Sequence, residues 1–357
     1  MTSNRSPLLL KPVTAGVILL SLFLPIAGQT RDTLPATLSD GEFWSLTEEI
    51  SEPDGYFRSN SGSPDNLLSN ESTVSTVAAA LAGRVKPAGV YLGVGPEQNF
   101  TYIAAIRPRI AFITDIRRGN LHLHLLYKAV FEMSANRMDF VSLLFDRKRP
   151  AGLTTRSTAR ELMSALQQAN PGDETAFRAN LKAITDHLTK TRRLPLGADD
   201  LAGIEYVYRN FHRFGPDIQY SSSIGGRSGV SYVTLMSTID SATRAERSYL
   251  ANEDTFAFIK AMQQKNLIVP IVGDFAGPKA LRSLGAFLRS RGATVSAFYL
   301  SNVEMYLQNN GVWPKFCANV AAMPLDAGST FIRPKGGNSR ASGQFGAMAA
   351  ETAACPK

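Results

Sequence analysis

The sequence predicts an α/β fold, a doubly wound, mostly parallel sheet of about six strands with a helical insertion. Two observations predict it. Short, nearly continuous apolar segments alternate with helical segments, a pattern typical of parallel strands covered on both faces by helices. Between residues 146 and 200 the alternation stops and amphipathic helical segments replace it. A chain of 357 residues is long enough for one such domain with an insertion.

The first 28 residues have the pattern of a secretory signal peptide. Arg5 and Lys11 precede the uncharged stretch PVTAGVILLSLFLPIAG, and Ala27 and Gly28 then offer a cleavage point. An uncleaved membrane anchor is the alternative, because the apolar stretch is only slightly shorter than a bilayer span. Both interpretations predict an exported protein, periplasmic or extracellular, whose only contact with a membrane is this segment.

The segment 29–68 is rich in Ser, Asp, Pro and Gly, so we expect it to be mostly irregular. It contains one predicted short helix, SDGEFWSLTEEI, in which Ser39 and Glu42 have the spacing of a capping box. The α/β domain is predicted to follow over residues 69–334. Its first element is a helix in SNESTVSTVAAALAG, capped by a polar residue near Asn70 and ended by a glycine.

The alternating elements can be assigned in chain order. The predicted strands are residues 88–94, 109–115, 139–145, 230–240, 267–275 and 294–304. The predicted helices between them are residues 97–107, 120–135, 244–266 and 278–292. The helical insertion, residues 146–200, contributes two amphipathic segments, STARELMSALQQAN and DETAFRANLKAITDHLTKTRR.

The last segment, 335–357, is rich in Gly, Ala and Ser and is predicted to be a flexible tail. The sequence has two cysteines, Cys317 and Cys355. In an oxidising compartment they could form a disulfide that ties the tail to the domain. Two unpaired thiols are the alternative.

Residues at the ends of the predicted strands are the candidates for a site, because ligands of an open parallel sheet bind outside its carboxyl ends. Glycine or polar residues stand at five of these ends: Gly93, Gly95, Asp115, Asp240, Asp274, Ser301, Asn302 and, just beyond, Glu304. Capping of the next helix is the alternative role for the acidic ones. Gly95 and Asp115 are 20 positions apart, the spacing at which an acidic residue on a second strand reaches a ribose hydroxyl.

The order of glycine turn, helix and strand ending in Asp, over residues 86–145, resembles the first half of class I S-adenosylmethionine-dependent methyltransferases. The resemblance implies that Gly93 and Gly95 lie against the amino-acid part of S-adenosylmethionine and that Asp115 binds its ribose. It also brings Glu97, where that family usually has a third glycine, to the cofactor site. The chain is similar, in addition, to uncharacterised exported bacterial proteins that carry the segments SNVEMYL and GSTFIRP.

The first hypothesis is a methyltransferase-like enzyme, and it gives roles to the remaining candidates. The acidic residues would face the substrate as catalytic candidates, namely Glu71, Asp240, Asp274 and Glu304. The substrate-binding candidates are Asn70, Ser301 and Asn302. Tyr91 and Glu97 differ from the family's usual pattern and keep a second hypothesis open: an exported binding or structural protein that has the sheet without the cofactor chemistry.

Other function classes are disfavoured by the sequence. Hydrophobic residues make up 44% and charged residues 19%, which excludes wholesale disorder. The net charge of +8 is spread along the chain, so it favours a solvated basic surface over a nucleic-acid site. His122 and His124 are two positions apart on a predicted helix, so they do not form a metal pair, and we predict no metal site. We expect a small-molecule ligand and make no prediction of oligomeric state.

Overall fold

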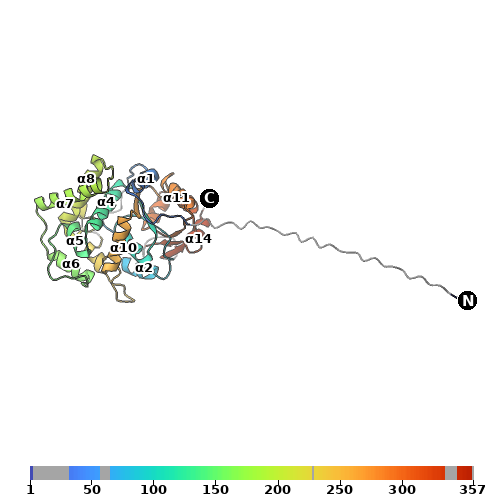
Figure 1. The fold of residues 1–357 in the computed structure, drawn as a ribbon, viewed down its shortest axis with the longest axis horizontal. Coiled ribbons are helices and arrows are strands. Elements are labelled where there is room, and N and C mark those ends of the chain that lie inside the picture. Colours follow the sequence, from blue (N-terminus) through green and yellow to red (C-terminus); the bar gives the residue numbers. More distant parts are fainter. Residues whose placement is uncertain (3–31, 57–64, 227–228, 334–343, 356–357) are drawn as a thin grey trace. The chain divides into compact units, whose positions relative to one another are not determined.

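The computed structural model (Figure 1) describes five stretches of the chain, residues 1–2, 32–56, 65–226, 229–333 and 344–355. The predicted leader over residues 1–28 lies outside the described residues except for its first two. Within the described stretches, no helix combines the length and the apolar character that a membrane crossing requires.

Six strands of the described residues form one sheet in the order β3-β2-β1-β4-β5-β6. The strands are β1 (Val90–Gly93), β2 (Ile110–Asp115), β3 (Ile268–Val272), β4 (Val295–Tyr299), β5 (Thr330–Ile332) and β6 (Phe345–Ala347). The pairings among β1 to β5 are parallel, and β6 runs antiparallel to β5. The strand order reverses at β1. Such sheets bind ligands in the crevice outside the carboxyl ends of the two strands at this point, here β1 and β4.

The structure is therefore α/β, and it has fourteen α-helices in the part of the chain that it describes. The first seven are α1 (Asp40–Ile50), α2 (Val74–Leu81), α3 (Gln98–Ile106), α4 (Arg118–Met133), α5 (Arg137–Phe145), α6 (Ala159–Gln168) and α7 (Glu174–Asp186). The others are α8 (Ala198–Phe214), α9 (Tyr232–Ser237), α10 (Glu253–Gln264), α11 (Ala280–Ser290), α12 (Val303–Asn309), α13 (Trp313–Ala321) and α14 (Met348–Ala353). The capping box predicted at the start of α1 is present between Ser39 and Glu42.

Four of the predicted strands are confirmed as β1 to β4. Every residue of these strands is buried, which is why each reads as an unbroken apolar run. The pairing places Leu92 of β1 beside Phe112 of β2 on one side and Phe298 of β4 on the other.

Two predicted strands, residues 139–145 and 230–240, are wrong because the first lies in α5 and the middle of the second forms α9. Asn136 caps α5 by accepting a hydrogen bond from the backbone N–H of Asp139 at 3.0 Å, and Ser231 caps α9 in the same way from Thr234 at 3.2 Å. A short apolar run fits a buried helix as well as a buried strand, and the cap decides between them.

The described part of the connection from β2 to β3 contains seven α-helices, α4 to α10, which extend beyond residues 146–200 on both sides. This connection begins with α4 and ends with α10, and α8 packs against both α4 and α5. In Figure 1 the labels α5 to α8 gather together, away from α11 and α14. A π-helical turn, His187–Thr191, extends α7.

The C-terminal segment is not the flexible tail predicted for residues 335–357 in the part that the structure describes. Residues of β6 pair with β5, and α14 packs against α13. A disulfide joins Cys317 of α13 to Cys355, with their Cα atoms 6.2 Å apart. The sequence analysis did not predict β6, because a three-residue strand that contains glycine has almost no sequence signal.

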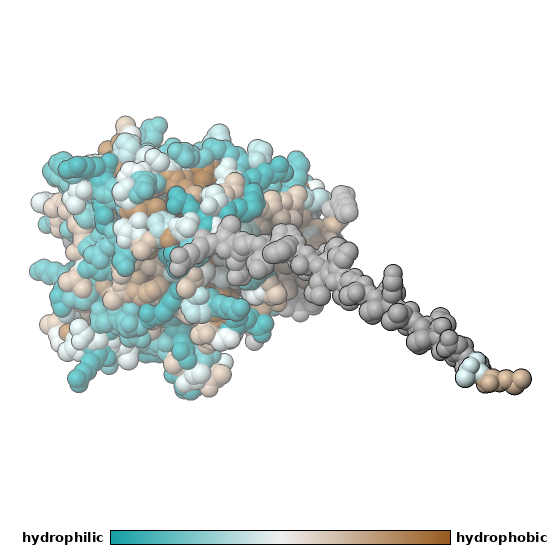
Figure 2. Space-filling view, turned by 45° about the vertical axis from the view of Figure 1, so that its right-hand side comes forward, coloured by the Kyte–Doolittle hydropathy of each residue, from teal (hydrophilic) through white to brown (hydrophobic). Residues whose placement is uncertain are grey.

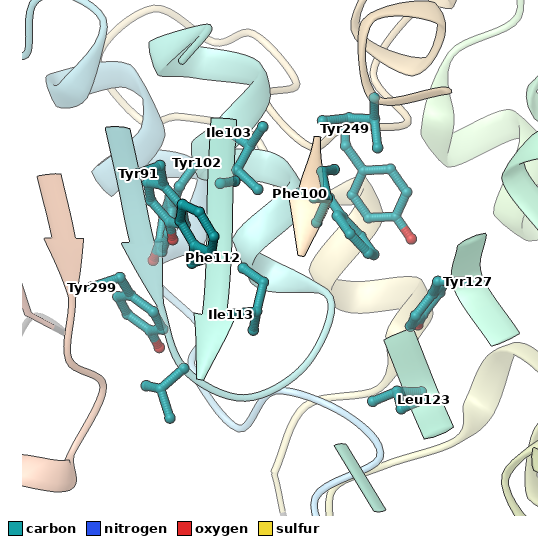
Figure 3. Packing of buried hydrophobic residues seen from close by; sticks show 14 of the residues in the cluster. Tyr91, Phe100, Tyr102, Ile103, Phe112, Ile113, Leu123, Tyr127, Tyr249 and Tyr299 are labelled. Carbon is teal, nitrogen blue, oxygen red and sulfur yellow. The ribbon is translucent and has the colours of Figure 1, made fainter. Parts of the chain in front are cut away.

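Two clusters of aromatic side chains pack around β1 and α3 (Figure 3). The ring of Tyr102 lies 5.0 Å from that of Tyr299, and Phe100 meets Tyr127 at 5.1 Å and Tyr249 at 5.4 Å, edge to face. Such contacts fix the helix after β1 against the sheet. On the face shown in Figure 2, hydrophilic residues predominate and hydrophobic residues lie between them, as on an ordinary globular surface.

Candidate functional site

The carboxyl ends of β1, β2, β3 and β4 open into one cleft, which we call the edge cleft. It comprises about 1010 Å³ of space, part of which is open to solvent. Six of the residues that the sequence analysis singled out line it: Asn70, Gly95, Asp115, Asp274, Ser301 and Asn302. Residues far apart in the sequence therefore meet at one site.

The turn from β1 into α3 is held by the side chain of Asn99. Its Nδ2 donates to the carbonyl oxygens of Val94 at 2.9 Å and Pro96 at 2.7 Å. Gly95 has a φ of +76°, a conformation that L-residues with side chains rarely adopt. A Cβ atom on Gly93 would overlap Oδ1 of Asn99, so Gly93 makes room for the anchor of the turn and does not line the cleft.

His124 of α4 supports the same turn from behind. Its Nε2 lies 2.9 Å from the carbonyl oxygen of Gly95, so Nε2 carries the proton and donates it. Burial lowers the pKa of His124 from 6.5 to about 4, which keeps the ring neutral. Its Nδ1 is buried and has no hydrogen-bond partner among the described residues. Its role is to hold the turn in place.

Glu97 is the N-cap residue of α3 and does not line the edge cleft, contrary to its prediction as a cofactor residue. Its carboxyl group is fully buried and accepts the backbone N–H of Ser69 at 3.3 Å. Burial raises the pKa of Glu97 to about 8, and the nearby charge of Glu71 adds to the rise. At neutral pH the group is therefore mostly a protonated acid inside the protein.

Asp115 ends β2 and lines the cleft beside the glycine turn. Its Oδ1 accepts the backbone N–H of Arg117 at 3.0 Å, and Nε of Arg117 lies 3.6 Å away. Burial raises the pKa of Asp115, and Arg117 opposes that rise. A buried carboxylate that faces a cleft is able to accept hydrogen bonds from ligand hydroxyl groups.

Asp274 follows β3 and is fixed by the N-terminal segment. The backbone N–H of Asp274 donates to Oε2 of Glu52 at 3.0 Å, and Oδ1 of Asp274 accepts the N–H of Ala276 at 2.9 Å. The backbone N–H of Gly273 donates to the carbonyl oxygen of Asp115 at 2.8 Å. The β2 and β3 ends are thus tied together at the cleft.

Ser301 and Glu71 form a hydrogen-bonded pair where β4 ends. Oγ of Ser301 donates to Oε1 of Glu71 at 2.7 Å. Glu71 is 8% exposed, and its Oε2 has no hydrogen-bond partner among the described residues. Burial raises the pKa of Glu71, and the bond from Ser301 offsets only part of that rise. Ser301 lines the cleft and Glu71 stands behind it.

Two of the acidic candidates lie elsewhere. Asp240 does not follow a strand; it closes a loop by accepting hydrogen bonds from the backbone and side chain of Thr243. Glu304 is buried in α12 and binds Arg333 through both carboxylate oxygens, at 2.6 and 2.9 Å. Neither carboxylate lines the edge cleft. Asp240 was predicted at the cleft because residues 230–240 were predicted to be a strand. Glu304 was predicted there because its partner Arg333, 29 positions away, cannot be recognised from the sequence.

With the geometry established, the chain can be compared with known proteins. A family model described as "Domain of unknown function (DUF7790)" matches residues 67–200 and 220–350. The chain belongs to this family. No curated protein matches it. The matched ranges contain all six strands of the described sheet, so the sheet and most of the edge cleft lie within the DUF7790 domain.

The edge cleft of this DUF7790 protein also contains residues that the sequence analysis missed. Gln98 is 3% exposed; its Nε2 donates to the carbonyl oxygen of Val94 at 3.1 Å, and its buried Oε1 has no partner among the described residues. Oδ1 of Asn66 is in the same state. The position of Gln98 at the start of the helix after the glycine turn is a usable signal, whereas Asn66 lies in a loop without a motif.

Proposed function

We propose that this DUF7790 protein binds S-adenosylmethionine in the edge cleft and transfers a methyl group to a small molecule, on a doubly wound, methyltransferase-like sheet. One observation carries the proposal. The glycine turn at Gly95 and the carboxylate of Asp115 stand at the carboxyl ends of two paired strands and line the same cleft. That is the arrangement in which a βαβ unit binds a nucleoside.

The residues of the cleft suit the parts of this cofactor. The carboxylate of Asp115 is the acceptor for the two ribose hydroxyls. The turn at Gly95 admits the amino-acid part close to the backbone. The free Oε1 of Gln98 and Oδ1 of Asn66 are buried acceptors that a ligand amine can satisfy. Phe275 and Asp274, after β3, are left for the adenine ring and its amino group.

S-adenosylmethionine supplies an electrophilic methyl group when bound, and the protein has to remove a proton from the substrate atom that receives it. We assign this task to Glu71, acting through the hydroxyl of Ser301, because this pair lies where β4 reaches the cleft. The raised pKa of Glu71 makes it a stronger base than an exposed carboxylate. Asn70 and Asn302 line the cleft beside the pair and would orient the substrate.

The test is calorimetry with S-adenosylmethionine and its demethylated product, with NAD as the comparison nucleotide. We expect both sulfur compounds to bind and NAD to bind at least ten-fold more weakly. Asp115→Asn should weaken binding about ten-fold, or about 1.4 kcal/mol, because one ribose acceptor is lost. Asp240→Asn changes a buried aspartate outside the cleft and should leave the affinity unchanged.

Absence of binding at millimolar concentrations of both compounds would overturn the proposal. It would favour an exported binding or structural protein on this sheet. Equal loss of affinity in the two variants would show that Asp115 acts only through the fold.

A further inference from the structure

A second cavity adjoins the edge cleft on the side of α4 and α8, and we call it the side cavity. It encloses about 670 Å³, including space open to solvent. Three residues line both spaces: Tyr56, Asn66 and Arg117. Neither the comparisons nor the function proposed above assigns a role to this cavity.

The side cavity is lined by an amide that the protein leaves unused. Asn120, in the first turn of α4, is 5% exposed, and both Nδ2 and Oδ1 are buried without a hydrogen-bond partner among the described residues. Burying an unsatisfied polar group destabilises a folded protein, so an amide with both groups unsatisfied is an unusual feature that a ligand could satisfy. Oδ1 of Asn66, which also lines the cavity, is unsatisfied as well.

Arg118, Asp200 and His122 form a hydrogen-bonded group beside the cavity, and of these three His122 lines it. Nε of Arg118 donates to Oδ1 of Asp200 at 2.8 Å, and Nε2 of His122 lies 2.9 Å from the same oxygen. Burial raises the pKa of Asp200, but the hydrogen bonds from Arg118 and His122 outweigh it and hold this pKa below its usual value. Arg117 pairs with Asp115. Two carboxylates also line the cavity: Oδ1 of Asp54 accepts the backbone N–H of Arg118 at 2.7 Å, and Asp65 accepts the hydroxyl groups of Tyr206 and Ser223. These carboxylates disfavour an anionic ligand, and the unused amide of Asn120 is left for hydrogen bonds.

The remaining lining includes apolar residues. Leu67 and Val207 are buried apolar residues of the lining, and Tyr206, whose side chain is exposed, also lines the cavity. A Cβ atom on Gly203 would overlap the ring of His122, so the backbone of α8 and this ring lie in close contact on one wall. The two apolar residues and the one free amide are complementary to an uncharged ring with a polar edge.

We propose that the side cavity binds an uncharged planar group that has a hydrogen-bond donor beside an acceptor, such as an aromatic carboxamide or the edge of a nucleobase. The ligand would pair with Nδ2 and Oδ1 of Asn120 through two hydrogen bonds. This inference depends only on the side cavity and holds whether or not the edge cleft binds S-adenosylmethionine.

The experiment uses nicotinamide and nicotinate, which share a ring and differ in offering a carboxamide or a carboxylate. Ligand-observed NMR titrations of the purified protein should give at least ten-fold tighter binding of nicotinamide. Adenine is titrated in parallel: tighter binding than nicotinamide would assign the cavity to nucleobases, and weaker binding would assign it to carboxamides. Both results lie within the proposal.

Two substitutions locate the binding. Asn120→Leu keeps the size of the side chain and removes both polar atoms, so nicotinamide binding should be lost while the melting temperature stays the same or rises. Asn120→Asp keeps the acceptor and removes the donor, so binding should weaken about ten-fold. Gln263→Met, which removes a buried amide outside both cavities, is the matched control and should bind like the wild type.

Several results would overturn the inference. The first is equal affinity for nicotinamide and nicotinate. The second is that neither nicotinamide nor adenine binds at millimolar concentration. The third is unchanged affinity of Asn120→Asp for nicotinamide. Competition by the demethylated cofactor that persists in Asn120→Leu would place the bound nicotinamide in the edge cleft and would also reject it. The wild-type comparison of the two probes remains decisive if either variant fails to fold.

Discussion

His124 on α4 donates a hydrogen bond from Nε2 to the carbonyl oxygen of Gly95 on the turn after β1, at 2.9 Å. A helix that follows β2 thereby fixes the loop that follows β1. The pKa of His124 is about 4 in the folded protein because of burial, against 6.5 as its ordinary value. The stability that the neutral ring contributes is thus complete above pH 6.5 and is lost as the pH falls towards 4, because the unfolded chain takes up the proton first.

The variant His124→Gln keeps a donor and cannot titrate in this range. We expect its free energy of unfolding to be lower than that of the wild type at pH 7 and the difference to shrink by pH 4.5. Urea unfolding at both pH values measures this. Parallel stability curves for the two proteins would show that His124 does not titrate as its burial requires.

Glu97 should give the opposite dependence on pH. Its pKa of about 8 lies above the ordinary 4.5 because of burial, so its contribution is present below pH 4.5 and is lost as the pH rises through 8. Glu97→Gln resembles the protonated acid at every pH. Between pH 5 and 8 the stability of this variant relative to the wild type should rise, by up to about 1.4 kcal/mol per pH unit. A difference that stays constant over this range would contradict the prediction.

Gly93→Ala should destabilise the protein by about 1–3 kcal/mol, because its Cβ atom would displace the side chain of Asn99 from the turn. Gly41→Ala is the control, since a Cβ atom at Gly41 in α1 meets nothing within 4 Å. We expect that change to stabilise the helix by about 0.5–1 kcal/mol. Thermal unfolding of both variants measures the contrast. Unchanged or increased stability of Gly93→Ala would show that Asn99 does not need the space at Gly93.

Loss of the disulfide between Cys317 and Cys355 should lower the free energy of unfolding by about 4 kcal/mol, from the chain entropy of a loop whose ends are 38 positions apart. The double variant Cys317→Ser with Cys355→Ser, or reduction of the wild type, tests this by urea unfolding. Alkylation of the exported, unreduced protein should modify neither cysteine. Full modification of both would show that the bond does not form there.

The leader is tested by N-terminal sequencing of protein recovered from an exporting host. Cleavage should leave a chain that begins between Gly28 and Thr30, as the small residues after the apolar stretch predict. An intact Met1 in the membrane fraction would favour the anchor. An intact Met1 in a soluble cytosolic fraction would contradict both.

The sequence predicted the part of the fold in which burial is complete on both sides of a strand. The runs at Val90–Gly93 and Ile110–Asp115 are unbroken and apolar, and the turn between them has a glycine with positive φ. Residues 139–145 are equally apolar, but they are buried as a helix among other helices. Only the cap at Asn136 separates the two cases, and a single polar residue before an apolar run is a weak signal.

The candidate site was predictable where it depends on strand ends and not where it depends on distant partners. Asp115 and Ser301 line the edge cleft because they follow strands of one parallel sheet. Glu304 satisfied the same rule, yet its carboxylate is taken by Arg333. Asn120 belongs to no sequence motif. We selected it as a ligand-binding candidate because its side-chain amide has no hydrogen-bond partner among the described residues, and no sequence pattern reveals that property.

The last strand of the sheet has a consequence for the chain during its synthesis. Until Phe345–Ala347 have been made, β5 has no neighbour on its outer side, and its backbone N–H and C=O groups on that side are available to any other extended chain. The same late segment brings Glu351, which shares the buried Arg333 with Glu304. A chain that stops after Arg333 would therefore expose β5 as an unprotected edge strand and would be prone to aggregation.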